Sequence, residues 1–365
     1  MRSINATIVT DEKGENLLFE SKERVIGLDI LKILSCLGIT MIHFLGYTNV
    51  ISSFVGLHYN KVLAYIFNIL IRTAVNIFIM ISGYFLVKSK FKYRRLFSIW
   101  GETLVYSVLF FLIGAIFNLE SLSFSSIVKA AFPILSRHYW FATSYIVLYL
   151  LSPFINRMVC DLSKKEYTVL VCGGAILFSV WTTFIWFSDG ALTGGPTSIL
   201  WVVFMYLVGG YIRLYPPKIK KHTLFIVFTL LVGALVVYQY LKENISFLLN
   251  FGFLKEDSCF SLILSVILFL LFKDIKSKNL SVNKIITTLS GASFGVYLIQ
   301  ENCMIRNWLW LEVVRSKTMV YKWYLFPIFL LVMVCLFAMA LIISGIYKIA
   351  FEGICNKLEP KKDNN

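Results

Sequence analysis

The chain has 365 residues, of which 58% are apolar and only 15% are charged, and its mean hydropathy is strongly positive. A soluble domain does not have this composition, so we predict a polytopic membrane protein. The net charge of +15 comes from basic residues spread over many loops rather than gathered on one surface, which argues against a nucleic-acid-binding protein.

Ten apolar stretches are long enough to cross the hydrocarbon core of a bilayer. In chain order they cover residues 28–47, 62–87, 96–117, 139–156, 167–186, 198–215, 223–241, 258–272, 288–305 and 324–347. The sequence therefore predicts an all-α fold with about ten transmembrane helices. We expect a cytoplasmic segment at 1–27, a membrane domain at 28–350 and a cytoplasmic tail at 351–365.

The distribution of basic residues predicts the orientation in the membrane. With the N-terminus inside, the cytoplasmic segments carry 24 Lys and Arg residues and the opposite segments carry nine. Because Lys and Arg accumulate in short cytoplasmic loops, we expect both termini to be cytoplasmic. The first 27 residues lack the apolar core and cleavage site of a signal peptide, so we expect the first helix to be retained. The seven cysteines show no metal-ligand spacing, and no metal is expected.

Three ionisable residues share one face of the first apolar stretch, LDILKILSCLGITMIHF. At about 100° per residue, Lys32 and His43 differ in direction by about 20°, and Asp29 lies about 40° from His43. Charged groups are costly inside a bilayer and normally face a protein interior or a water-filled cavity, so we interpret the three as a reactive site. The alternative is a buried polar trio that holds helices together. Lys32 and His43 are about 16 Å apart along the helix and cannot contact the same atom.

The second apolar stretch carries Arg72, Asn76 and Gly83 at helical spacing. Arg72 needs a partner at membrane depth, which is either a bound anion or acceptor, or a structural ion pair such as one with Asp29. The pair Ser82-Gly83 permits close approach of another backbone. We prefer a role in helix packing to a nucleophilic serine, because no adjacent base can be named.

Five segments, in order, carry a family resemblance. They are LDILKILSCLGITMIHF, IFIMISGYFLV, KYRRLFSIW, YWFATSYIVLYLLSPFI and SFGVYLIQ, and the resemblance extends from about residue 24 to about residue 350. The first has an acidic-x-x-basic start, with ten residues between the basic residue and a histidine. Their order and spacing resemble the acyltransferase-3 family of integral membrane acyltransferases, which modify sugars and cell-envelope glycans.

Two positions depart from the pattern of that family. Lys32 stands where the family usually has arginine, which keeps the positive charge but loses the forked contact to a carboxylate or phosphate. Gln300 stands where a histidine is common, so a second-histidine role is not transferred, and the nearby Glu301 is not assigned that role. The chain lacks the soluble hydrolase-like domain of some members, so we expect the stand-alone type.

The resemblance implies transfer of an acyl group, most often acetyl, from cytoplasmic acyl-CoA to a hydroxyl of a sugar in an envelope polysaccharide or its lipid-linked precursor. His43 is then the candidate general base. Asp29 orients or balances Lys32, while Lys32 or Arg72 stabilises oxyanion charge or binds donor phosphate. Acyl-CoA, most often acetyl-CoA, is the expected co-substrate. Direct transfer and a transient acyl-enzyme are both open.

Four further residues are candidates for substrate or donor binding. Arg94 and Arg95 lie in a basic segment that can hold CoA phosphates, although every cytoplasmic loop is expected to be basic. Trp140 and Tyr297 are the aromatic candidates. For Trp140 an interfacial aromatic belt is the preferred interpretation, and stacking on a sugar or adenine is the alternative.

A transporter of a glycan precursor or small anion is the competing class, because intramembrane Lys, Arg, Asp and His also suit a translocation path. A non-catalytic scaffold explains the hydrophobicity but leaves the aligned ionisable residues without a purpose. We expect the protein in a bacterial plasma membrane, with the lipid bilayer, acyl-CoA and a glycan or lipid-linked sugar as partners and no nucleic acid. Protein partners are unknown from the sequence.

Overall fold

A short hairpin precedes a set of helices. The computed structural model describes residues 7–10, 16–19, 24–119, 122–185 and 194–358. Strand β1 (Thr7–Thr10) pairs antiparallel with β2 (Asn16–Phe19), with Thr7 opposite Phe19. All other described secondary structure is helical, which confirms the predicted helical class of the membrane-spanning part.

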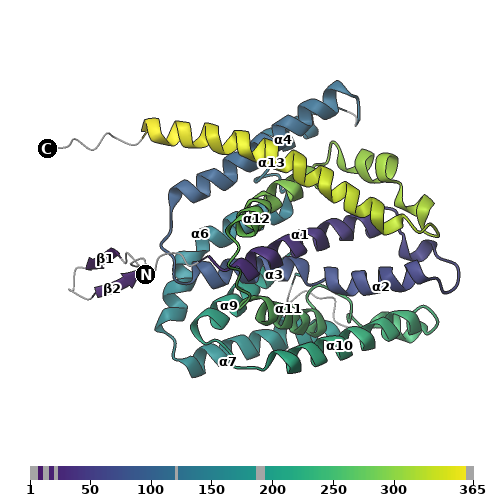
Figure 1. Cartoon of the computed structure of the whole chain (residues 1–365), viewed down its shortest axis with the longest axis horizontal. Helices are drawn as coiled ribbons and strands as arrows, with labels where there is room; N and C mark the ends of the chain where they lie inside the picture. The colour runs from purple at the N-terminus through teal and green to yellow at the C-terminus, as the bar shows by residue number, and fades with distance from the viewer. Residues whose placement is uncertain (1–6, 11–15, 20–23, 120–121, 186–193, 359–365) are drawn as a thin grey trace.

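The helices follow one another through the rest of the described chain, and Figure 1 shows their arrangement. The α-helices are α1 (Ile26–Gly46), α2 (Tyr59–Ile71), α3 (Ala74–Leu86), α4 (Tyr93–Ile116), α5 (Phe124–Ala131), α6 (Trp140–Asp161), α7 (Lys164–Ala175), α8 (Trp181–Phe184), α9 (Ile199–Leu214), α10 (Lys221–Leu241), α11 (Cys259–Phe272), α12 (Leu280–Gln300) and α13 (Leu325–Leu358). Short 3₁₀ helices are η1 (Ile51–Ser53), η3 (Ser246–Asn250) and η5 (Ser316–Met319), and π-helical turns are η2 (Ile176–Val180) and η4 (Trp308–Val314).

Seven helical spans in the described part of the chain are long and apolar enough to cross a membrane. They are Ile26–Ser53, Tyr59–Leu86, Tyr93–Ile116, Lys164–Phe184, Lys221–Leu241, Leu280–Gln300 and Leu325–Lys357, and α9 and α11 are shorter apolar helices. The polytopic class is therefore confirmed, whereas the predicted count of about ten is only approximate. The fourth predicted span, α6, is not among the seven because Asn156 and Arg157 interrupt its apolar run.

The second predicted span is interrupted between α2 and α3, at Arg72 and Thr73. Thr73 donates to the carbonyl of Leu70 from its backbone N–H at 3.1 Å and from Oγ1 at 2.6 Å. The backbone bond spans three residues rather than four, so the chain tightens at this point. The interruption places Arg72 at a helix junction rather than inside a continuous helix.

Side-chain caps fix the starts of α9, α11 and α12. Ser198, Ser258 and Asn279 each accept a hydrogen bond from the backbone N–H three residues further on, at 3.1–3.2 Å. Such caps stabilise a helix by about 1 kcal/mol each, because they satisfy a donor that the first turn leaves unpaired. They define where α9, α11 and α12 begin.

Helices α3 and α9 pack against each other through glycines. A Cβ atom on Gly83 would lie 2.1 Å from the carbonyl oxygen of Tyr206, and one on Gly209 would lie 2.1 Å from that of Met80. No side chain fits at either position without moving a backbone. The packing role predicted for Gly83 is therefore confirmed.

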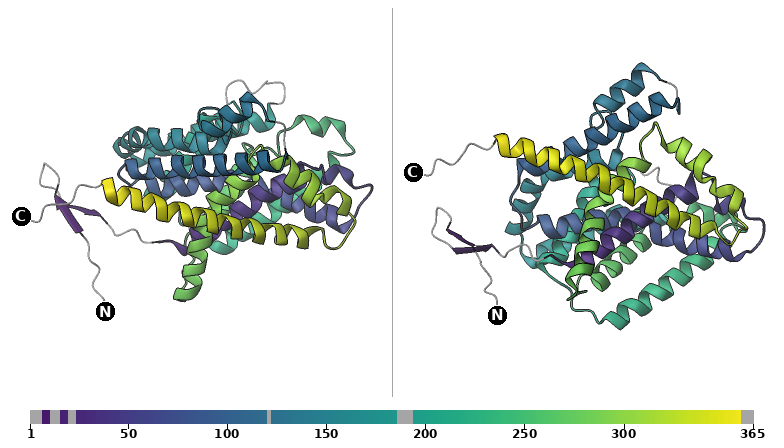
Figure 2. Two further views of the ribbon diagram at one scale, coloured as in Figure 1. Left: turned by 90° about the horizontal axis from the view of Figure 1, so that it is seen from above. Right: turned by 45° about the horizontal axis from the view of Figure 1, so that its top comes forward.

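Helix α1 lies at the centre of the bundle and packs against α2, α3, α11, α12 and α13. The long α13, yellow in Figures 1 and 2, runs along one side, where it contacts α4 and α12. The start of α1 and the end of α13 both lie towards the left of Figure 1. Asp29 and Lys32 lie near the start of α1 and His43 lies near its end, so the candidate residues of this helix fall into two groups.

Candidate functional site

A cavity of about 160 Å³ lies beside the C-terminal end of α1. Helices α1, α3, α6 and α12 contribute to its wall, together with the segments that precede α9 and α11. The lining residues are Ile39, Ile42, His43, Val75, Asn76, Trp140, Phe141, Pro196, Thr197, Glu256 and Tyr297. The wall thus combines an imidazole, a carboxylate, an amide and several aromatic rings.

His43 is held by a carboxylate and two aromatic rings. Its Nε2 lies 3.0 Å from Oε1 of Glu301, and the two side chains are 16% and 8% exposed. The imidazole stacks on Tyr47 and on the buried Trp310, with ring centroids 5.3 Å and 6.2 Å away. The contact is an ion-pair distance and not a hydrogen bond, since Oε1 of Glu301 has no hydrogen-bond partner among the described residues. Because Nε2 is the ring nitrogen nearer Glu301, Nδ1 is the one that remains for another partner.

Glu301 lies at the C-terminal end of α12, directly after Gln300. Its second oxygen, Oε2, lies 3.8 Å from Nη1 of Arg306, and the Arg306 guanidinium is 5.3 Å from the centroid of the Tyr47 ring. Glu301 thus lies between Arg306 and His43. A carboxylate that fixes the orientation of an imidazole is the arrangement found in many catalytic bases.

Trp140 and Tyr297, both predicted for substrate or donor binding, also line the cavity. The hydroxyl of Tyr297 accepts a hydrogen bond from the backbone N–H of Phe141 at 3.1 Å. Trp140 begins α6 and is partly exposed, as an interfacial aromatic residue would also be. Their positions bring them to the same cavity as His43, and their roles remain predictions.

Asp29 and Lys32 lie at the other end of α1. Asp29 accepts hydrogen bonds from Arg24 at 2.9 Å and from Ser290 at 2.6 Å. Lys32 forms no ion pair or hydrogen bond with the described residues, but it lies close enough to Asp29, Arg95 and Glu102 to interact electrostatically. The structure therefore separates Asp29 and Lys32 from the His43 cavity, as expected from their spacing along the helix.

The two basic candidates at the start of α4 have different environments. Arg95 donates from Nη2 to the hydroxyl of Tyr145 at 2.9 Å, and its guanidinium is 5.3 Å from the centroid of the Tyr149 ring. Arg94 is exposed. Arg95 is therefore the arginine of this pair that shares an electrostatic environment with Lys32.

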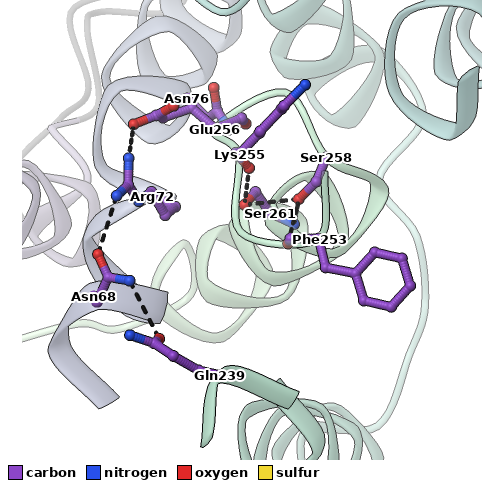
Figure 3. Close-up of polar contacts among 9 residues, drawn as sticks. All are labelled: Asn68, Arg72, Asn76, Gln239, Phe253, Lys255, Glu256, Ser258 and Ser261. Carbon is purple, nitrogen blue, oxygen red and sulfur yellow. Dashed lines mark hydrogen bonds and ion pairs between the residues drawn. The ribbon is translucent and has the colours of Figure 1, made fainter. Parts of the chain in front are cut away.

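Arg72 forms an ion pair with Glu256, which precedes α11. The suggested pair between Arg72 and Asp29 is therefore wrong, because Asp29 is taken by other partners. Nη2 of Arg72 also donates to Asn68 at 3.0 Å, as Figure 3 shows. Glu256 could not be predicted as the partner of Arg72 from the sequence, since it lies in a loop with no spacing signal that links the two residues.

Burial lowers the pKa of His138, which lies between α5 and α6. Its Nε2 accepts a hydrogen bond from the backbone N–H of Cys303 at 3.1 Å, and its ring stacks on Tyr139 with centroids 4.4 Å apart. A protonated ring cannot accept that hydrogen bond. His138 therefore joins the α5–α6 segment to the end of α12 in its neutral form.

Protonation of His138 is expected to destabilise the fold. Because its folded-state pKa is lowered, the unfolded chain binds the proton more readily, and the stability that the neutral ring provides is lost as the pH falls below about 6.5. Thermal unfolding of the full chain in detergent, from about pH 7.5 to about pH 5, should show a smaller fall in Tm for His138→Gln than for the wild type. The exposed His222→Gln is the control and should match the wild type. Equal pH dependence in all three proteins would contradict this prediction.

One comparison with known proteins identifies the family. A family model described as an acyltransferase domain matches residues 25–348, and this range includes His43, Glu301 and every residue that lines the cavity. No curated protein and no solved structure matches the chain. Because the match extends over nearly the whole sequence and the fold is a polytopic helical bundle, the chain belongs to the acyltransferase-3 family of membrane acyltransferases.

Proposed function

We propose that this protein is an O-acyltransferase of a bacterial plasma membrane. It moves an acyl group, most often acetyl, from cytoplasmic acyl-CoA to a sugar hydroxyl of a cell-surface polysaccharide or its lipid-linked precursor. The observation that supports this proposal most strongly is the His43–Glu301 pair beside a cavity at the end of α1. The family membership supports the acyl-transfer chemistry.

His43 acts as the general base in the proposed reaction. Nε2 lies beside Glu301, so Nδ1 takes the proton of the acceptor hydroxyl as its oxygen attacks the thioester carbonyl. The new bond joins the hydroxyl oxygen to the acyl carbon, and the bond between that carbon and the CoA sulfur breaks. The proton then passes from His43 to the departing thiolate, which leaves as the CoA thiol. This direct transfer needs no acyl-enzyme intermediate.

Lys32 and Arg95 bind the donor at the opposite end of α1. Both are cationic, and they lie within electrostatic range of each other. Asp29 and Glu102 also lie within electrostatic range of Lys32, so part of its charge is balanced before any ligand binds. The phosphates of CoA are anions that both cations can bind. The flexible pantetheine arm then spans the length of α1 towards His43, a distance of about 16 Å. In this proposal Arg72 does not bind donor phosphate, because Glu256 already occupies it.

Replacement of Arg95 is expected to weaken donor binding. We expect Arg95→Gln to raise the KM for acetyl-CoA by about 10-fold or more, because a hydrogen bond between charged groups is lost. Initial rates of acyl transfer in membrane vesicles measure the effect. Arg213→Gln is a matched control, since Arg213 also contacts a tyrosine, with Nη1 donating to the Tyr84 hydroxyl at 3.1 Å. An equal rise of KM in both variants would assign the effect to the loss of basic charge in general.

The first test of the proposed function compares cells that lack the gene with cells in which it is restored. Proton NMR of the purified surface glycan measures its acyl content, and the yield of glycan measures polymer export. Loss of acyl groups with intact polymer supports the transferase. An unchanged acyl pattern with less surface polymer would instead support a transporter. Transfer of radiolabel from acetyl-CoA to glycan in membrane vesicles then tests the donor.

A further inference from the structure

Among the described residues, Glu256 is the one carboxylate that lines the cavity, on the part of the wall formed by the loop before α11. Its side chain is 24% exposed, although an ion pair with Arg72 holds it. Arg72 contacts Oε1, and Oε2 has no partner among the described residues. A carboxylate oxygen without a partner, beside a cavity that also contains a candidate base, is available to accept a hydrogen bond from a ligand.

The loop around Glu256 is fixed by hydrogen bonds to its backbone. Asn76 Nδ2 donates to the carbonyl of Glu256 at 2.8 Å, and Ser261 Oγ donates to that of Lys255 at 2.7 Å. The next carbonyl, that of Asp257, accepts from Ser179 Oγ at 3.0 Å. Figure 3 shows the contacts of Lys255 and Glu256 beside Arg72. The position of the carboxylate is therefore set by α3, α11 and η2 before any ligand binds.

Arg72 is itself held in place by a chain of amides. Its Nη2 donates to Asn68 Oδ1 at 3.0 Å, and Asn68 Nδ2 donates to Gln239 Oε1 at 3.2 Å. Arg72 thus links α2, α10 and the loop that carries Glu256, as Figure 3 shows. Because Arg72 fixes the orientation of the Glu256 carboxylate, a ligand spends no binding energy on ordering that side chain. A carboxylate fixed in this way can discriminate between ligands.

We propose that Glu256 Oε2 accepts a hydrogen bond from a second hydroxyl of the acceptor and so selects which hydroxyl faces His43. This inference rests on the proposed acyl transfer. The acceptor class is then a sugar or polyol with at least two hydroxyls, since a carboxylate oxygen accepts strong hydrogen bonds from hydroxyl donors. Glu256 is an acceptor-binding residue, and Arg72 is a positioning residue that acts through it.

The main test compares Glu256→Gln with the matched Glu243→Gln. Glu243 also forms an ion pair, with Lys61 at 2.7 Å, but it does not line the cavity. The assay uses membrane vesicles, radiolabelled acetyl-CoA and the host's surface glycan after removal of its acyl groups by base. We expect Glu256→Gln to raise the KM for the glycan by about 10-fold or more and to leave the KM for acetyl-CoA within about twofold. Glu243→Gln should leave both unchanged.

The position of the acyl group gives a second readout, which a purely structural role would not change. Proton NMR of the product glycan should show acylation at an additional hydroxyl with Glu256→Gln and at the wild-type position alone with Glu243→Gln. Arg72→Gln should raise the glycan KM in the same way, and the double variant should be no worse than Glu256→Gln alone. If Glu256→Gln does not accumulate in the membrane, Glu256→Asp keeps the charge but moves the oxygen, and we expect the same rise in glycan KM.

The outcomes separate this inference from the proposed function. No transfer of label by the wild type overturns the proposed function. Transfer by the wild type with an unchanged glycan KM and an unchanged acyl position in Glu256→Gln overturns only the role of Glu256. A fall in kcat with both KM values unchanged would also overturn it, because Glu256 would then act in the chemical step.

Discussion

Replacement of His43 by alanine is expected to lower the kcat for acyl transfer by about 100- to 10,000-fold, the range over which a positioned base accelerates proton transfer. The imidazole is the general base in our proposal, and alanine cannot accept the proton of the hydroxyl. Glu301 would keep Arg306 as a nearby countercharge, with Oε2 3.8 Å from Nη1, so the fold should persist. Radiolabel transfer from acetyl-CoA to glycan, at matched membrane abundance, measures the effect.

Two variants separate the loss of the base from other effects of this substitution. His43→Gln retains an N–H that can donate to Glu301, so it preserves the contact but not the base, and it should lose as much activity as His43→Ala. His222→Ala removes an exposed histidine at the start of α10 and should retain full activity. A His43→Ala enzyme whose kcat stays within about tenfold of the wild type would exclude His43 as the base.

The sequence predicts the positions of the helices well, because each apolar stretch must be helical to satisfy its backbone in a bilayer. All ten predicted stretches contain helix in the structure. The interruption at Arg72 was not predicted, since apolar periodicity continues on both sides of it. Length and apolarity also do not show which helices reach across the membrane, and the short α9 and α11 illustrate this.

Residues on one helix were easier to relate than residues on different helices. The spacing of Asp29, Lys32 and His43 correctly places Asp29 and Lys32 at one end of α1 and His43 at the other, because a single rise per residue determines it. No such rule relates His43 to Glu301 or Arg72 to Glu256, whose contacts depend on how α12 and the loop before α11 pack against the rest. The carboxylate partners of His43 and Arg72 could therefore be identified only from the three-dimensional structure.

Replacement of Glu301 by glutamine is expected to lower kcat by about 100-fold or more, with both KM values close to those of the wild type. The carboxylate orients His43 through the 3.0 Å contact to Nε2 and stabilises the positive charge that forms when Nδ1 takes the proton. A neutral amide gives no such charge stabilisation, so the imidazolium that forms during the reaction loses its countercharge.

Glu312→Gln is the matched control for Glu301→Gln. Glu312 pairs with Arg315 at 2.7 Å in the same part of the chain, but its side chain is 61% exposed, so loss of that pair should leave kcat unchanged. Glu301→Asp keeps the charge and should recover part of the activity, provided that the shorter side chain still reaches His43. If Glu301→Gln instead raises the KM for glycan at constant kcat, Glu301 binds the acceptor and does not position the base. His43 would then have to act without an orienting carboxylate.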